Sequence, residues 1–202
     1  MNVQEYFDTL HELWDGQIVV TALGTNLDEW WRRTGDDGCF YMNAAMGFAS
    51  SFAIGLSLSV PDHEVWLLDS DGGVAMNAGG LLTEASTQPG NLTHFVFDNH
   101  CYGCLSSNKL VNADQTDYAA IGRAAGIANV HAVTDAAALR EAEVASRGRH
   151  GLVVADVEWD GSNADRFERQ LELGYEGPEM KYRFGRAMER RTGRPVFGPR
   201  GC

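Results

Sequence analysis

Three short polar segments directly follow apolar runs, and their residue types are suited to binding a ligand. They are residues 24–26, 69–73 and 98–103. In the second segment, Gly72 and Gly73 let the backbone come close to a ligand. The helix expected after them would present N–H groups to a phosphate. The plain alternative is an Asp-Gly turn that only caps a helix.

Asp71 lies in the same segment, where its carboxylate would repel a phosphate unless a metal ion stood between them. Mg²⁺ binds phosphates together with one or two protein oxygens. Asn99 follows 28 residues later, at the end of the next apolar run, and its side chain offers a second oxygen. The pattern therefore predicts a magnesium–phosphate site.

These segments need a scaffold that brings them together. Apolar runs typical of buried parallel strands occupy residues 18–23, 65–68, 94–97, 130–133 and 152–157. Helical patterns cover residues 3–14, 44–59, 75–87, 117–126 and 135–147, and residues 24–26 are expected to form a turn. The alternation indicates an α/β fold, a doubly wound, mainly parallel sheet with helices on both faces. Ligands bind beyond the carboxyl ends of such strands, where the three segments stand.

The 202 residues divide into a sheet domain, residues 1–159, and an extension, residues 160–202, which we expect to be partly helical. Residues 161–202 hold nine Lys or Arg against six Asp or Glu, and residues 1–160 hold seven against 22. The net charge is therefore +3 for residues 161–202 and −15 for residues 1–160. The basic extension is expected to clasp an acidic surface of its own chain or of a neighbour, or to be a solvated helix.

The net charge of −12 argues against nucleic acid and anionic lipid as partners. Glu5 and Asp8 interrupt the start of the chain, so we expect no signal peptide and a cytoplasmic protein. The uncharged residues 40–60 are long enough to test as a membrane span. Their small side chains favour a buried helix instead.

Read in order, FYMNAAMG (40–47), SDGGVAMN (70–77) and FDNHCYG (97–103) resemble the diphosphate-binding module of thiamine diphosphate enzymes. The family hallmark is Gly-Asp-Gly followed by an Asn-Asn-like pair, and its counterparts here are residues 70–72 and 98–99. The family also has an apolar-Gly dipeptide upstream, here Met46 and Gly47. Met46 precedes Asp71 by 25 residues, which fits the decarboxylase branch that includes sulfopyruvate and phosphonopyruvate decarboxylases.

The resemblance implies that Asp71 and Asn99 ligate Mg²⁺ by side chain and Cys101 by its backbone carbonyl. It implies that Gly72 and Gly73 donate backbone N–H groups to the diphosphate. The full set implied for the cofactor is Gly24, Thr25, Asn26, Ala44, Met46, Ser70, Asp71, Gly72, Gly73, Asn99, Cys101 and Tyr102.

Two further roles concern catalysis. By the resemblance, Met46 is the apolar wedge that bends the cofactor, and the Ala44 carbonyl accepts a hydrogen bond from its aminopyrimidine. His100, next to a metal ligand, is a candidate proton donor or substrate contact, with a structural histidine as the alternative.

The implied reaction is the non-oxidative decarboxylation of a 2-oxo acid, with release of CO₂ and an aldehyde or carboligation to an aldehyde acceptor. The family also needs a glutamate at the pyrimidine N1′, supplied by a separate pyrimidine-binding domain. The sheet domain leaves no room for that domain. We therefore expect a hetero-oligomer in which an α-type partner subunit supplies this glutamate.

Several alternatives stay open. Ser70 stands where the family has Gly, which keeps a non-catalytic subunit with the same fold in view. The β subunit of a 2-oxoacid:ferredoxin oxidoreductase carries the same module, although clustered cysteines are scarce here. Cys101 and Cys104 form a C-x-x-C, which suggests a redox pair or half a metal site, or neither. Residues 30–31, both Trp, are expected in helix packing, with an interface or pocket as the alternative.

Overall fold

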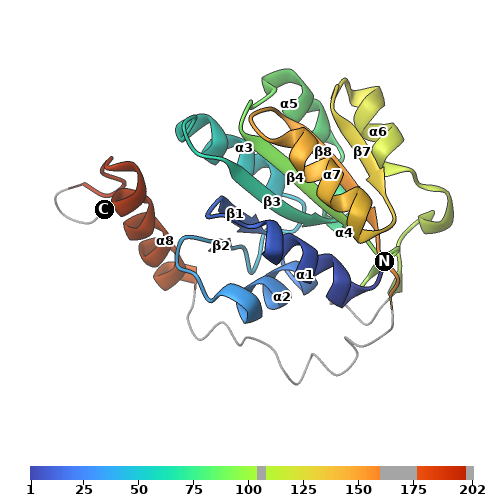
Figure 1. The fold of residues 1–202 in the computed structure, drawn as a ribbon, viewed down its shortest axis with the longest axis horizontal. Helices are drawn as coiled ribbons and strands as arrows, with labels where there is room; N and C mark the ends of the chain where they lie inside the picture. Colours follow the sequence, from blue (N-terminus) through green and yellow to red (C-terminus); the bar gives the residue numbers. More distant parts are fainter. Residues whose placement is uncertain (104–107, 160–176, 199–202) are drawn as a thin grey trace.

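The computed structural model describes residues 1–103, 108–159 and 177–198. Six parallel strands form one sheet in the order β2-β1-β3-β4-β8-β7 (Figure 1). In chain order they are β1 (Ile18–Thr21), β2 (Phe40–Tyr41), β3 (Val65–Ser70), β4 (Leu92–Asp98), β7 (Val130–Val133) and β8 (Gly151–Asp156). A separate antiparallel ladder joins β5 (Cys101–Tyr102) and β6 (Asn108–Lys109). The predicted parallel α/β sheet is confirmed.

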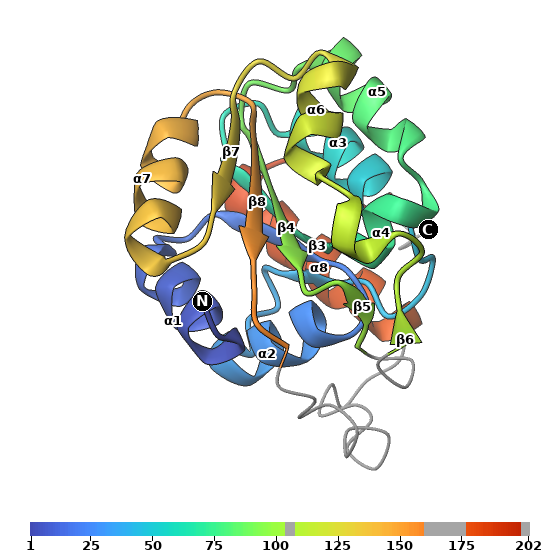
Figure 2. The same cartoon turned by 90° about the vertical axis from the view of Figure 1, so that its right-hand side faces the viewer.

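Helices cover both faces of this sheet (Figure 2). The first face packs against α1 (Val3–Leu13), α2 (Thr25–Thr34) and α7 (Ala136–Ser146). The second packs against α3 (Ala49–Ser59), α4 (Asp71–Met76), α5 (Gly79–Thr87) and α6 (Tyr118–Ala125), which follows a short 3₁₀ turn, Ala113–Gln115.

Side chains of each strand alternate between these two layers. Trp66 and Leu68 of β3 enter the first layer, whereas Val65 and Leu67 enter the second. Both faces are covered, so both sets of side chains are apolar. This explains why the strands read as continuous apolar runs in the sequence.

Helix α2 was not among the predicted elements. The turn after β1 ends at Gly24, and Thr25 already begins the helix. Trp30 is fully buried on the inner face of α2, edge-on to Trp14 with ring centroids 5.7 Å apart. Trp31 packs edge-on against Tyr41 at 5.1 Å. The expectation that this Trp pair serves helix packing is confirmed.

The helix predicted over residues 44–59 begins later, at Ala49. Ala45 and Gly47 have φ angles of +57° and +81°, and left-handed backbone of this kind cannot continue a right-handed helix. The helix predicted over residues 75–87 is likewise two helices, because Asn77 leaves the helical conformation and ends α4. The side-chain Nδ2 of Asn77 donates a hydrogen bond to the Gly47 carbonyl at 2.8 Å.

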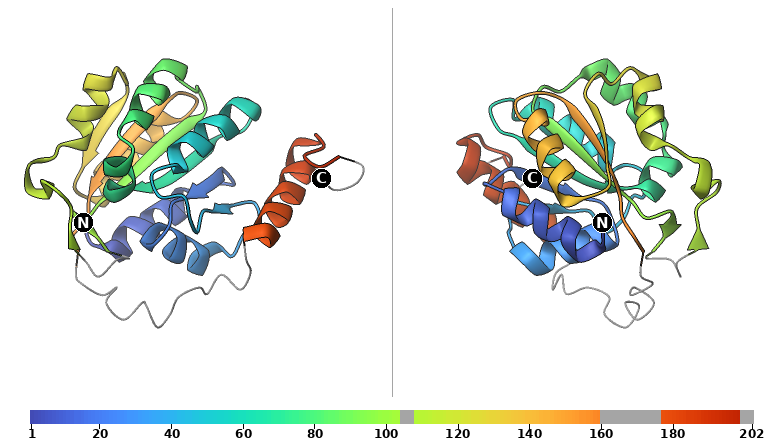
Figure 3. Two further views of the ribbon diagram at one scale, coloured as in Figure 1. Left: turned by 180° about the vertical axis from the view of Figure 1, so that it is seen from behind. Right: turned by 45° about the vertical axis from the view of Figure 1, so that its right-hand side comes forward.

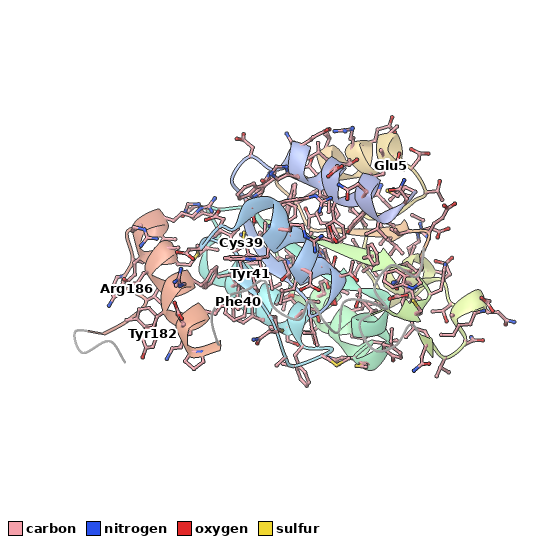
Figure 4. The ribbon with its side chains drawn as sticks, turned by 90° about the horizontal axis from the view of Figure 1, so that it is seen from below. Glu5, Cys39, Phe40, Tyr41, Tyr182 and Arg186 are labelled. Carbon is pink, nitrogen blue, oxygen red and sulfur yellow. The ribbon has the colours of Figure 1, made fainter. Side chains whose placement is uncertain are left out.

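The extension contains one described helix, α8 (Gly177–Thr192), beside β2 at the edge of the sheet (Figures 1 and 3). Phe184 packs edge-on against Phe40, with centroids 5.3 Å apart, and Arg183 lies 3.4 Å from Asp37. Tyr182 and Arg186 stand on the outer side of the helix (Figure 4). The basic extension thus contacts its own chain. Residues 160–176 and 199–202 lie outside the described part.

None of the helices in the described ranges is long and apolar enough to cross a membrane. In particular, the uncharged stretch over residues 40–60 contributes β2 and the 11-residue helix α3, which packs on the sheet.

Candidate functional site

Four loops meet at the carboxyl ends of β1, β2, β3 and β4 and line one pocket. The chain runs from β1 out to the edge strand β2 and then returns to β3 on the other side of β1. Such a reversal opens a crevice at the strand ends, where open α/β sheets bind ligands. Ten residues predicted for the site line this pocket: Thr25, Asn26, Ala44, Met46, Ser70, Gly72, Gly73, Asn99, Cys101 and Tyr102.

The Asn99 side chain meets two oxygens at this pocket. Its amide satisfies its hydrogen bonding when the nitrogen donates to Asp71 Oδ1 at 3.2 Å and to the Cys101 carbonyl at 2.9 Å. Turning the amide over would bring its oxygen to the same place, beside the other two oxygens. Octahedral Mg²⁺ ligands at about 2.1 Å lie roughly 3 Å apart. The cluster therefore closes on itself through hydrogen bonds, and with the amide turned over it would fit a divalent cation.

Asp71 is buried directly behind the pocket wall. Its Oδ1 accepts the Gly72 N–H at 2.7 Å, and its Oδ2 accepts the Asn99 N–H at 3.2 Å. Burial and then the charge of Asp98 raise the pKa of Asp71 to about 8. Burial also raises the pKa of Asp98. Two adjacent buried carboxyl groups are costly to ionise together, and a bound cation would offset that cost.

The turn between β3 and α4 carries its own hydrogen-bond acceptors. Ser70 Oγ caps α4 by accepting the Gly73 N–H at 3.1 Å. The two glycine N–H groups predicted to meet a diphosphate thus already have acceptors, Asp71 for Gly72 and Ser70 for Gly73. A diphosphate must displace these bonds to bind as predicted.

Both positions in this turn require glycine. A Cβ on Gly72 would lie 2.8 Å from the Tyr102 ring, and one on Gly73 would collide with Asp69 Oδ1. The space left by the missing side chains of Gly72 and Gly73, which the sequence suggested for a ligand, is occupied by the protein's own Tyr102 and Asp69.

The loop after β2 forms the rim of the pocket. Ala44 and Met46 line the pocket, and Gly47 is packed so tightly that a Cβ there would lie 3.1 Å from Cβ of Met76. Together with the Asn77 hydrogen bond, this contact ties the rim to the junction of α4 and α5.

Asn26, in the first turn of α2, is buried at the pocket. Its Nδ2 donates to the Asp69 carbonyl at 2.9 Å, and its Oδ1 has no hydrogen-bond partner among the residues that the structure describes. A buried acceptor of this kind needs a donor from a ligand or a water.

Three predicted site residues lie off the pocket lining. Asp71 is behind the wall, and Gly24 is the N-cap of α2, with a φ of +94° and ψ of −136° that favour glycine. His100 has a φ of +61°, and its ring faces acids: Nδ1 lies 3.3 Å from Asp98 and Nε2 lies 3.6 Å from Asp156. Its predicted catalytic role remains a prediction.

The C-x-x-C cannot be followed across its length, since Cys104 lies outside the described residues. Cys101 is buried at the pocket, where its carbonyl joins the oxygen cluster. Within the described ranges, no three His, Cys, Asp or Glu side chains gather as a metal site. A cation here would depend on mixed ligands instead.

Asp69, a buried acid, lines the pocket. The sequence analysis included it in the segment 69–73, directly after the apolar run VWLL, but assigned it no role at the site. The other lining residues that were not predicted are Ala22, Leu23, Met42, Ala45, Gly47, Ala49, Phe97 and Gly103. Most are small or apolar, and only their place in the fold marks them.

Residues 25–157, well over half of the chain, match the family described as thiamine pyrophosphate enzyme, C-terminal TPP binding domain. A solved structure, a putative thiamin diphosphate-dependent enzyme from Mycobacterium smegmatis, superimposes with a TM-score of 0.63 at 17% identity. It covers 79% of this chain and 32% of that one. At that identity the likeness shows the fold.

Three curated relatives are similar in sequence. Sulfopyruvate decarboxylase subunit beta of Methanothermobacter thermautotrophicus is 38% identical over 112 residues, 55% of this chain and 60% of that protein. Phosphonopyruvate decarboxylase of Streptomyces viridochromogenes is 34% identical over 125 residues, 62% of this chain and 31% of that protein. Sulfopyruvate decarboxylase subunit beta of Methanococcus maripaludis is 29% identical over 188 residues, 92% and 97% of the two chains. The chain thus matches less than two thirds of the length of the first two relatives.

Proposed function

Because the chain belongs to the thiamine pyrophosphate enzymes, with the C-terminal TPP-binding domain over residues 25–157, we propose that it is the β-type subunit of a split 2-oxo acid decarboxylase. Thiamine diphosphate and Mg²⁺ are the proposed cofactors. The proposed reaction is non-oxidative, releasing CO₂ and an aldehyde or joining the product to a second aldehyde. The decarboxylase names of the relatives support this class.

The observation that carries the proposal is the oxygen cluster at the pocket. The Asn99 amide lies about as far from the Asp71 carboxylate and from the Cys101 carbonyl as neighbouring Mg²⁺ ligands lie from one another, and burial and the charge of Asp98 raise the pKa of Asp71. An ordinary helix cap needs none of this. In the proposal, the side chains of Asp71 and Asn99 and the carbonyl of Cys101 would hold the Mg²⁺.

The remaining pocket residues bind and orient the cofactor. The N–H groups of Gly72 and Gly73 would donate to the diphosphate once Asp71 and Ser70 released them, and residues 24–26 would close the other side. Met46 would be the apolar support of the cofactor, the Ala44 carbonyl would accept a hydrogen bond from it, and Tyr102 would line its site. When bound, thiamine diphosphate supplies the electron sink for decarboxylation. His100 would contact the substrate or donate a proton to it, once its ring turned away from Asp98 and Asp156.

An α-type pyrimidine-binding subunit is the proposed partner, and it supplies the N1′ glutamate. Relatives that carry the name subunit beta support a second kind of subunit. An uncharged face adjoining the pocket supports it too: residues 42–60 and 72–83 contain no Asp, Glu, Lys or Arg. The two stretches contact each other, since Asn77 donates to the Gly47 carbonyl and Gly80 packs against Ser50. Phe48 is 59% exposed in the first stretch and Leu82 is 62% exposed in the second, as expected of an interaction surface.

The test is a titration of the native assembly with thiamine diphosphate, with and without Mg²⁺, followed by CO₂ release from 2-oxo acids that carry a sulfonate or phosphonate. Mg²⁺-dependent binding coupled to decarboxylation is expected. An assembly with iron–sulfur absorbance near 400 nm and electron transfer to ferredoxin would point to the oxidoreductase instead.

One observation favours a second candidate, a non-catalytic subunit. The Ser70 hydroxyl occupies the Gly73 N–H that the cofactor needs. If the assembled protein ignored thiamine diphosphate at all Mg²⁺ concentrations, this second function would replace the first.

A further inference from the structure

A row of buried ionisable side chains runs from the protein's edge to the floor of the pocket. Glu84 on α5 lies between two histidines: its Oε2 is 2.9 Å from His94 Nδ1, and its Oε1 is 2.7 Å from His150 Nε2. On its far side, His94 Nε2 lies 3.6 Å from Asp69 Oδ2. Glu84 and His94 are both 0% exposed, and Asp69 is buried as well.

Such a row is not needed to fill the core. Its neighbours on β3 and β4 are mostly apolar, and apolar residues of similar volume commonly replace buried ion pairs without loss of stability. The charges are nevertheless well matched. The ion pair with His94, together with the His150 contact, lowers the pKa of Glu84 to about 2 against the opposing effect of burial. Burial lowers the pKa of His94, but Glu84, with help from Asp69, outweighs that effect and raises it to about 10.

The inner end of the row is a structural junction of the pocket. Asp69 Oδ1 accepts the Ser70 N–H at 2.8 Å, and the Asp69 carbonyl accepts from Asn26 Nδ2 at 2.9 Å. The same carboxylate fills the space beside Gly73 where a Cβ would otherwise stand. Its position therefore determines how the Ser70–Gly73 backbone lies against the pocket.

We propose that Glu84 and His94 are positioning residues for the cofactor-binding turn: through their contact with Asp69 they hold the residue 70–73 backbone in the arrangement that receives the diphosphate. This inference rests on the proposed function, because it assigns the turn to thiamine diphosphate. Glu84 and His94 do not touch the cofactor. They act through Asp69.

The test measures thiamine diphosphate affinity of the native assembly by calorimetry at fixed Mg²⁺, together with the thermal midpoint. Glu84→Gln keeps the shape of the side chain and removes its charge, and we expect about tenfold weaker binding with kcat at saturating cofactor within about twofold. Glu143→Gln is the matched control, since Glu143 is 1% exposed and paired with Arg147 on α7, away from the pocket. It should lower the thermal midpoint without changing the affinity.

A double-variant cycle separates positioning from general destabilisation. If Glu84 acts through Asp69, Glu84→Gln should add less than about twofold to the affinity loss already caused by Asp69→Asn. Additive losses would overturn the proposal, as would wild-type affinity in Glu84→Gln. His94→Gln interrupts the same row and serves if Glu84→Gln does not fold. A wild-type assembly that binds no thiamine diphosphate would instead refute the proposed function, and the positioning role with it.

Discussion

At the scale of single residues, the site is built from groups that are in poor environments without a ligand. Asp71 is buried next to a second acid, and Asn26 Oδ1 has no donor among the described residues. Each of these is stabilised by a cation or a hydrogen-bond donor. Without a ligand, these groups lower the stability of the fold, and the same groups are available to bind one.

Asp71 should therefore show opposite effects on stability and binding. Its folded-state pKa of about 8 lies above the ordinary 3.8, so the stability that this group contributes is present below about pH 3.8 and is lost as the pH rises toward 8. Asp71→Asn should raise the free energy of unfolding of the metal-free protein by about 1–3 kcal/mol at pH 8, because the buried charge is gone. The same change should weaken Mg²⁺-dependent cofactor binding by ~100-fold.

Urea unfolding of wild type and Asp71→Asn at pH 5 and pH 8, each with and without Mg²⁺, measures the first effect. The wild type should lose stability between the two pH values without Mg²⁺ and recover it with Mg²⁺. A variant less stable than wild type at pH 8 without Mg²⁺ would contradict the assignment of a buried, poorly solvated carboxyl.

Ser70 tests whether the turn must open for the diphosphate. Ser70→Gly removes the hydroxyl that holds the Gly73 N–H. Loss of one competing hydrogen bond, about 0.5–1.5 kcal/mol, should tighten thiamine diphosphate binding roughly three- to tenfold by calorimetry. Weaker binding would mean that the Ser70 hydroxyl itself contacts the cofactor. Ser70→Ala is the control, because it removes the same hydroxyl without adding backbone freedom.

At the scale of elements, helix ends and backbone turns decide where the residues point. Left-handed backbone at Ala45 and Gly47 turns the rim of the pocket back toward α4, and the helix break at Asn77 completes that contact. The apolar spacing predicted one helix over residues 44–59, which includes both the rim and α3. A periodic pattern of side chains does not reveal a positive φ angle.

We predict that helix α8 of the extension stabilises the sheet domain. Phe184 is buried against Phe40, whereas Tyr182 stands on the outer side of the same helix. Phe184→Ala should cost about 3–5 kcal/mol of unfolding free energy if α8 belongs to the core. Tyr182→Ala, the control on the exposed side, should cost less than about 1 kcal/mol. Equal and small effects in denaturant unfolding would show that α8 does not stabilise the domain.

At the scale of the whole molecule, charge is distributed unevenly over the surface. A chain with a net charge of −12 keeps residues 42–60 and 72–83 free of Asp, Glu, Lys and Arg, next to the pocket. We expect the proposed partner subunit to cover this face, so that the pocket lies between the two chains.

Leu82→Asp places a charge on that face. Val144→Asp is its control and places a charge on α7; the two side chains are similarly exposed, 62% and 58%. Leu82→Asp should weaken association with the pyrimidine-binding subunit at least about tenfold, measured by light scattering, because burying an unpaired charge is costly. Val144→Asp should leave it unchanged. Equal behaviour of the two variants would place the partner elsewhere.

The sequence by itself determined the fold class and three of the four segments that form the pocket. Parallel strands buried on both faces must be apolar throughout, and their polar ends then stand out at the edge where ligands bind. Eight of the ten predicted residues that line the pocket lie in those segments, whereas Ala44 and Met46 were implied only by the family resemblance. The motif spacing also indicated the family, which the match over residues 25–157 confirms.

Only the tertiary structure decided the contacts made across the fold. Asp69, His94, Glu84 and His150 come from three strand regions and a helix, up to 81 residues apart, and no periodicity relates them. The Ser70 cap, the occupied N–H groups of the turn and the direction of the His100 ring depend on backbone angles and on neighbours distant in the chain. Apolar patterning determines which surface is buried, but it carries no information on which polar groups meet there.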